Sequence, residues 1–254
     1  MVNLPEWEYV GEQWKSDKRA EGWSHSSVVA TMRQHFPAFA AVVNGAGPLG
    51  IFPLAPQLRN ESGHNLSMTF GYVLARAAIG KTGLSLLDWG GALGHYALMA
   101  QRLLSEIPLD ITVKDLPDMC QVGKEIIPSV NFVSEDDVCF SRGYDLVMAS
   151  SSLQYAEHWR SIATRLVNSA RGWIFVTRLP VVRRAATFCV LQRPFAYGYR
   201  SEYLSWVFNR DEFLSCMTSA GARLEREFIA GGNTQYAGGP EISETAGFLF
   251  RAPA

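Results

Sequence analysis

The sequence predicts an α/β fold built on an open, mostly parallel sheet, and three observations predict it. The apolar run 84–87 ends in Asp88 and is followed by a glycine-rich turn and by apolar residues at helical spacing over 96–107. Short strand-like runs and helical segments then alternate along the chain, as in βαβ units. The chain has 254 residues, 48% of them hydrophobic, which allows one large domain with a substantial core.

The turn after the first strand has the features of a cofactor-binding loop. Gly90, Gly91 and Gly94 follow Asp88 at the start of the predicted helix. Unpaired backbone N–H groups gather at a helix N-terminus, and glycines let a ligand approach the backbone closely. The spacing departs from the G-x-G-x-x-G pattern of dinucleotide-binding proteins, which disfavours NAD. An ordinary turn without a ligand is the alternative.

A second acid follows at a distance typical of nucleotide-like cofactors. Ile111 and Val113 suit a strand, and Asp115 closes it, 21 positions after Gly94. An acid about 20 residues beyond such a turn binds ribose hydroxyls, because a carboxylate can accept two hydrogen bonds from a diol. A solvated acid or a helix cap is the alternative role for Asp115.

The other elements are predicted from periodicity and from residues that end or cap helices. Segments 26–43 and 66–79 show helical spacing, and Pro37 is expected to break or kink the first of them. Asn209 is expected to cap the helix that follows it. The first 65 residues are expected to lie outside the sheet. The remaining predicted strands cover residues 130–134, 144–150, 172–178, 224–229 and 246–251.

These motifs together resemble the class I S-adenosylmethionine (SAM) methyltransferases. Their motif I is acid-x-Gly-x-Gly-x-Gly; Asp88, Gly90 and Gly94 match it, and Ala92 replaces the middle glycine. The longer pattern Asp-Trp-Gly-Gly-x-Leu-Gly-His-Tyr resembles a family of bacterial methyltransferases of poorly defined chemistry. The resemblance covers roughly residues 66–254. It implies a Rossmann-like sheet with an antiparallel last strand and a helical lid in residues 1–65.

The resemblance also implies the cofactor, SAM, with S-adenosylhomocysteine as the product. The acid that follows the second strand would hold the ribose, and the loop after the third strand would meet the adenine ring. The predicted cofactor-binding residues are Asp88, Gly90, Gly91, Gly94, Asp115, Leu116, Ser134, Glu135 and Ser150.

An aromatic segment near 183–210 corresponds to the region that commonly shapes the acceptor pocket in this superfamily. Aromatic walls exclude water and position an acceptor, and Arg178 would bind an acceptor carboxylate through two hydrogen bonds. A satellite core or a homodimer surface is the alternative meaning of these aromatic residues. The predicted acceptor-binding residues are Gln154, Arg178, Tyr197 and Trp206.

Methyl transfer to an oxygen or to a protonated nitrogen requires a proton to leave, and histidine is the natural base near neutral pH. His95 directly follows motif I and is expected to support the cofactor, whereas a surface role is expected for His158. The segment 151–155 resembles motif IV and ends in Tyr155. We predict catalysis by proximity, assisted by Tyr155 or His25.

Composition narrows the function further. The net charge of −1, without a basic tract, argues against a nucleic-acid partner bound mainly through its phosphates. No apolar run approaches the roughly 20 residues of a membrane span, and the four scattered cysteines favour reduced thiols in the cytoplasm and no metal.

We expect methylation of a small molecule, first at an oxygen of a sugar or hydroxylated metabolite. N-methylation of an amino-acid-like or natural-product intermediate comes second, and a non-catalytic SAM-fold partner subunit is the alternative from another class.

Overall fold

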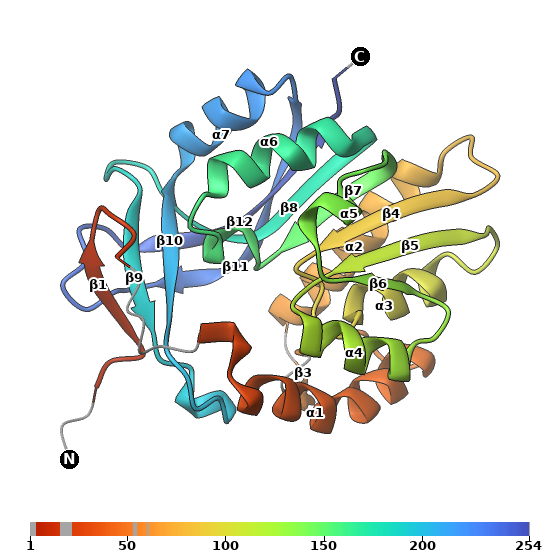
Figure 1. The fold of residues 1–254 in the computed structure, drawn as a ribbon, viewed down its shortest axis with the longest axis horizontal. Coiled ribbons are helices and arrows are strands. Elements are labelled where there is room, and N and C mark those ends of the chain that lie inside the picture. Colours follow the sequence, from red (N-terminus) through yellow and green to blue (C-terminus); the bar gives the residue numbers. More distant parts are fainter. Residues whose placement is uncertain (1–3, 16–21, 53–54, 60, 254) are drawn as a thin grey trace.

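In this computed structural model, which describes residues 4–15, 22–52, 55–59 and 61–253, ten strands form one sheet. Its central strands run in the order β6-β5-β4-β7-β8, all parallel, and β12 joins β8 antiparallel with β11 outside it (Figure 1). The predicted α/β class and its antiparallel closing pair are therefore confirmed. The bounds are β4 Leu84–Trp89, β5 Leu109–Lys114, β6 Asn131–Val133, β7 Tyr144–Ser150, β8 Ala170–Val182, β11 Arg223–Thr234 and β12 Ser243–Arg251.

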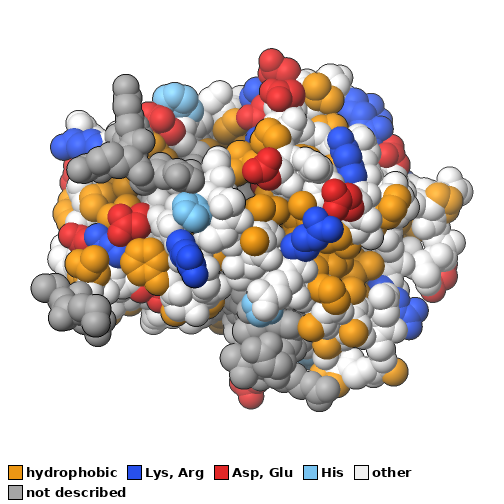
Figure 2. Space-filling model, turned by 60° about the horizontal axis from the view of Figure 1, so that its bottom comes forward, with side chains coloured by type: hydrophobic (Ala, Val, Ile, Leu, Met, Phe, Trp, Pro, Cys, Tyr) orange, Lys and Arg blue, Asp and Glu red, His pale blue; other side chains and the backbone are white. Residues whose placement is uncertain are grey.

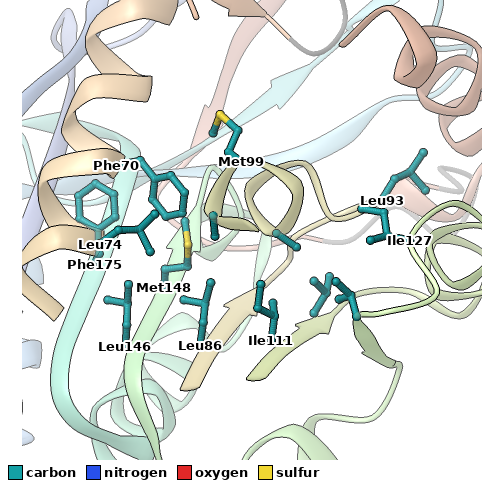
Figure 3. Packing of buried hydrophobic residues seen from close by; sticks show 14 of the residues in the cluster. Phe70, Leu74, Leu86, Leu93, Met99, Ile111, Ile127, Leu146, Met148 and Phe175 are labelled. Carbon is teal, nitrogen blue, oxygen red and sulfur yellow. The ribbon is translucent and has the colours of Figure 1, made fainter. Parts of the chain in front are cut away.

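Helices cover both faces of this sheet because the apolar residues of its strands point alternately to each side. The register places Leu86 beside Ile111 and Leu146, and Figure 3 shows the three in a row beneath the helices. Their neighbours Leu87 and Val147 enter the opposite layer. The first face carries α2 Glu61–Ala78 and α3 His95–Leu103, and the second carries α6 Trp159–Ser169 and α7 Arg210–Ser219 (Figure 1).

The aromatic segment forms two further strands, which the sequence analysis did not predict. β9 Phe188–Gln192 and β10 Tyr203–Asn209 pair antiparallel, and β10 also meets the end of β8 in parallel. The N-terminal strand β1 Trp7–Gly11 pairs with β9. The expectation that the first 65 residues lie outside the sheet is therefore wrong. The pairing of β1 with β9 joins segments far apart in sequence, which local periodicity does not reveal.

The N-terminal helix α1 Ser26–Asn44 continues through Pro37, so the predicted break is absent. Proline removes one backbone hydrogen bond, but Phe36 and Phe39 are buried on either side of it. They pack in the same core cluster as residues of α3 and α4 Pro117–Ile126, and burying such a side chain contributes about 1.5–3 kcal/mol. Tertiary packing thus maintains the helix.

The helix boundary at Asn209 agrees with the prediction. Its Oδ1 accepts hydrogen bonds from the N–H groups of Asp211 and Glu212, at 3.0 and 3.1 Å, at the start of α7. The shorter elements are η1 Gly22–Ser24, β2 Ile51–Phe52, β3 Ala55–Arg59, α5 Asp136–Cys139, η2 Leu153–Tyr155 and η3 Phe195–Tyr197.

The surface agrees with the small net charge. On the face that comes forward when the side of α1 is turned to the viewer, acidic and basic side chains are interspersed with hydrophobic ones (Figure 2). Within the described ranges, no helix combines the length and the apolarity that crossing a bilayer requires.

Candidate cofactor and acceptor site

A cavity of about 490 Å³ lies at the carboxyl ends of β4, β5, β7 and β8. In open α/β sheets this edge is where ligands bind. The β4–α3 turn forms one wall, and Trp23 of η1 and Met32 of α1 contribute from the N-terminal segment. The N-terminal segment and the central sheet therefore enclose one cavity together.

The glycine turn adopts a conformation that side chains would obstruct. Gly90 and Gly94 have φ of +74° and +84°, in the left-handed region. A Cβ on Gly91 would collide with the Asp88 carboxylate. Ala92, at the place of the middle glycine, has φ +51°, and its N–H donates to Asp115 Oδ2 at 2.7 Å. This bond holds Ala92 in a conformation unfavourable for a residue with a Cβ.

Asp88 is a buried carboxylate in the wall of the cavity. It is 1% exposed, and neither of its carboxylate oxygens has a hydrogen-bond partner among the described residues. Burial, with a further contribution from the charge of Asp115, raises the pKa of Asp88 to about 7. A buried carboxylate without a partner is costly, so this position suits a ligand that brings a cation or a hydrogen-bond donor.

Asp115 has a structural role in addition to the predicted ribose contact. Its two oxygens accept the N–H groups of Ala92 and Leu116, each at 2.7 Å. Burial raises the pKa of Asp115, and these two hydrogen bonds act in the opposite direction. Each carboxylate oxygen can accept a further hydrogen bond. Asp115 thus fixes the turn and retains capacity for a diol.

At the predicted adenine position the structure favours a neighbouring residue. Ser134 and Glu135 are not among the residues that line the cavity, whereas Asp136 is. Asp136 Oδ1 accepts from Trp89 Nε1 at 2.8 Å and pairs with Lys114 Nζ at 3.1 Å. Of the three polar residues of this loop, only Asp136 therefore lines the cavity, and the predicted adenine contact of Ser134 and Glu135 has no support from it. Three consecutive polar residues after a strand do not reveal which of them faces inward.

Aromatic residues line one part of the cavity, which we call its aromatic end. Tyr155 and Tyr199 line it together with Trp23, whose ring lies 4.9 Å from that of Tyr155 and 6.2 Å from that of Tyr199. The Tyr155 hydroxyl donates to Gln192 Oε1 at 3.0 Å, and burial raises its pKa well above the usual value. Tyr155 is therefore protonated near neutral pH and suits positioning better than proton removal.

Of the four predicted acceptor-binding residues, only Arg178 lines the cavity. Gln154 is buried behind it, and its Nε2 donates to Ser151 Oγ and to the carbonyl of Arg178, at 3.1 and 3.4 Å. Trp206 donates its indole N–H to the carbonyl of Ala156 at 3.1 Å. Tyr197 is 43% exposed. Gln154, Tyr197 and Trp206 thus lie outside the lining of this cavity, which gives no support to their predicted contact with the acceptor.

Two residues with strained backbone lie on neighbouring strands beside the cavity. Ser151 follows β7 with φ +52°, and Arg178 lies within β8 with φ +57°. The Ser151 N–H donates to the carbonyl of Thr177 at 2.9 Å, which connects the two positions. Such conformations persist where the surroundings enforce them, and they gather at functional sites.

The histidines separate into three environments. His25 does not line the cavity; its Nδ1 accepts the Ser27 N–H at 3.0 Å and caps α1, so the structure gives no support to His25 as the base. His95 lines the cavity between Phe36 and Phe39, and burial, followed by the charge of Arg178, lowers its pKa to about 4. His158 is exposed, as expected, but it also lines the cavity.

Among the described residues, no group of three or more His, Cys, Asp or Glu side chains is placed to hold a metal ion. The four cysteines are free thiols, and Cys120, Cys139 and Cys189 are buried.

Comparison with known proteins identifies the fold. No protein-family model matches the chain, and no curated protein matches it in sequence. A candidate sarcosine dimethylglycine methyltransferase from Galdieria sulphuraria aligns over 88% of this chain and 98% of its own, with a TM-score of 0.56 and 12% identity. A SAM-dependent methyltransferase from Methanosarcina mazei aligns over 68% and 94%, with a TM-score of 0.51 and 13% identity. The chain has the class I methyltransferase fold.

A third structure has the same architecture. It is a candidate SAM-dependent methyltransferase from Listeria monocytogenes, which aligns over 74% of this chain and all of its own, with a TM-score of 0.52 and 9% identity. At these identities the likeness shows a shared fold. The assignment of activity therefore rests on the cavity.

Proposed function

We propose that the protein is a SAM-dependent methyltransferase acting on a small molecule. The observation that supports this most is Asp88, a buried carboxylate without a hydrogen-bond partner among the described residues, beside a glycine turn in a cavity. SAM carries an ammonium group, which a carboxylate without a partner would bind. It also carries a ribose diol, for which Asp115 retains acceptor capacity. The residues present fit the cofactor.

The remaining parts of the cavity suit the rest of the cofactor. Leu116 and Met119 offer apolar surface beside Asp136, which fits a flat ring with polar edges. We infer that Asp136, held by Trp89 and Lys114, contacts the adenine edge. SAM supplies an electrophilic methyl group when it is bound, and the protein orients the partners and excludes water. In our proposal η1 and α1, within residues 1–65, serve as the lid.

We infer that the acceptor is methylated on oxygen. The Tyr155 ring lines the cavity and its hydroxyl donates to Gln192, so the side chain is fixed where it can orient an acceptor hydroxyl. His158 lines the cavity and is exposed, so it is placed to take a proton and pass it to water. A hydroxyl requires such a proton acceptor, whereas a neutral amine does not lose its proton before attack.

Calorimetric titration with S-adenosylhomocysteine tests the cofactor proposal, with NADH as the control ligand. We expect S-adenosylhomocysteine to bind and NADH not to bind. Asp88→Asn, which keeps the shape and removes the charge, should weaken S-adenosylhomocysteine binding by about tenfold or more, as expected for a charge-assisted hydrogen bond. Binding of NADH alone would indicate a different cofactor, and binding of neither would favour the partner-subunit alternative.

A further inference from the structure

The aromatic end of the cavity contains hydrogen-bond donors that have no partner in the described part of the chain. The Tyr199 hydroxyl and the Trp23 Nε1 are both buried without one, and both residues line the cavity. Tyr199 is 2% exposed although it lines the cavity. Buried donors are almost always satisfied in folded proteins. Two such donors on neighbouring rings therefore indicate a place where a ligand supplies the acceptor atoms.

A positive charge lies at the same end. Arg178 lines the cavity, and its strained backbone is held at the carbonyl by Gln154. Burial raises the pKa of both Tyr155 and Tyr199, and in both the charge of Arg178 opposes that rise. The guanidinium also interacts with the Tyr96 hydroxyl. It therefore lies among the tyrosines, and a guanidinium has five N–H donors in a planar fork that matches the geometry of a carboxylate.

Acceptor groups line the same cavity. Asp88, Asp115 and Asp136 line it near the glycine turn, and ionised carboxylates only accept hydrogen bonds. The cavity thus has carboxylate acceptors beside the glycine turn and donors on the aromatic residues, and Arg178 also contacts Tyr96 in the first turn of α3. An uncharged sugar would leave the second set of groups poorly matched.

We propose that Arg178, Tyr199 and Trp23 bind a carboxylate of the acceptor, which makes the acceptor an aromatic hydroxycarboxylic acid. This proposal rests on the proposed function. A carboxylate offers about four lone-pair positions, enough for the guanidinium and two further donors. The rings of Trp23, Tyr155 and Tyr199 would pack against a flat apolar body.

The test uses benzoate, 4-hydroxybenzoate and 3,4-dihydroxybenzoate with the corresponding benzamides as neutral controls. Each is titrated at up to millimolar concentration into protein saturated with S-adenosylhomocysteine. We expect the benzoates to bind and the benzamides to bind about tenfold more weakly or not at all. Equal binding of acids and amides, or no binding of any benzoate, would overturn the proposal.

Tyr199→Phe separates a binding role from a structural one. If the hydroxyl serves a ligand, its removal should leave the thermal midpoint of the free protein unchanged or raise it, because no hydrogen bond is lost. Benzoate binding should fall several-fold, and S-adenosylhomocysteine binding should not change. A lower thermal midpoint with unchanged benzoate binding would contradict the proposal.

Arg178→Gln identifies whose carboxylate is bound, since the cofactor carries one too. We expect loss of benzoate binding with an unchanged Kd for S-adenosylhomocysteine. If S-adenosylhomocysteine binding falls while 5′-methylthioadenosine, which lacks the amino-acid part, binds as before, the carboxylate is the cofactor's and the proposal fails. If S-adenosylhomocysteine and 5′-methylthioadenosine both stop binding to Arg178→Gln, the effect of Tyr199→Phe on benzoate binding decides whether the proposal stands. Failure of the wild type to bind S-adenosylhomocysteine counts against the proposed function alone, because benzoate can then be titrated without it.

Discussion

Asp88→Asn should stabilise the free protein while it weakens cofactor binding. The wild-type carboxylate is buried, has no hydrogen-bond partner among the described residues and lies near the charge of Asp115. Each pKa unit corresponds to about 1.4 kcal/mol, so a rise from 3.8 to about 7 gives an upper bound of about 4 kcal/mol for the cost of ionising Asp88 in the folded protein. Asparagine has nearly the same shape and no charge to bury.

The sign of this effect depends on pH. Because the pKa of Asp88 is higher in the folded than in the unfolded protein, the folded protein holds this proton more tightly, and stability from this group is lost as the pH rises from about 4 to about 7. The advantage of the variant should therefore be largest at pH 8 and small at pH 4. At about 2–4 °C per kcal/mol for a chain of this size, the upper bound of about 4 kcal/mol corresponds to a rise of the thermal midpoint at pH 8 of at most about 8–16 °C.

Binding should show the opposite dependence in the wild type. An ammonium ligand requires ionised Asp88, so S-adenosylhomocysteine affinity should increase by about tenfold between pH 5.5 and pH 7.5 and then level off. Differential scanning calorimetry and titration calorimetry across this range measure both effects. A variant with unchanged stability at pH 8 and the same pH profile of binding as the wild type would refute the reasoning.

Three further substitutions have distinct expected outcomes. Gly91→Ala places a Cβ against the Asp88 carboxylate; we expect S-adenosylhomocysteine binding to fall by about tenfold or more, and unchanged binding by calorimetry would contradict the steric argument. Tyr155→Phe removes the hydrogen bond to Gln192 and should lower the free energy of unfolding in denaturant by about 1 kcal/mol, with unchanged cofactor affinity. Loss of cofactor binding would mean that Tyr155 lies in the cofactor site and not in the acceptor site. His158→Asn should slow transfer of labelled methyl groups from SAM to a hydroxylated acceptor by about 10²–10⁴ with unchanged cofactor binding, and wild-type rates would exclude His158 as the base.

The central sheet and its glycine turn were predictable because their signals are local. An apolar strand, three glycines and a following helix lie within one short stretch, and Asp115 follows at the distance that one crossover helix requires. The role of Ala92, by contrast, could be predicted only in part. The sequence shows that it replaces a glycine, whereas the hydrogen bond from its N–H to Asp115 requires the folded turn.

The acceptor end was predicted less well because its residues converge from distant segments. Trp23 and Tyr199 meet across a large sequence separation, and β1 joins the sheet by pairing with the distant strand β9. Tyr197 and Trp206 belong to the same aromatic segment as Tyr199, yet neither lines the cavity. Composition identified the segment, but which side each residue faces depends on strand pairing and on the turn between β9 and β10.

A crystal structure with S-adenosylhomocysteine bound tests the central claim most directly. We predict that the ligand fills the cavity at the carboxyl ends of β4 and β5, with its ammonium group at Asp88 and its ribose at Asp115. A complex in which the ligand lies elsewhere, or in which Asp88 stays without a partner while the cavity is filled, would contradict the account.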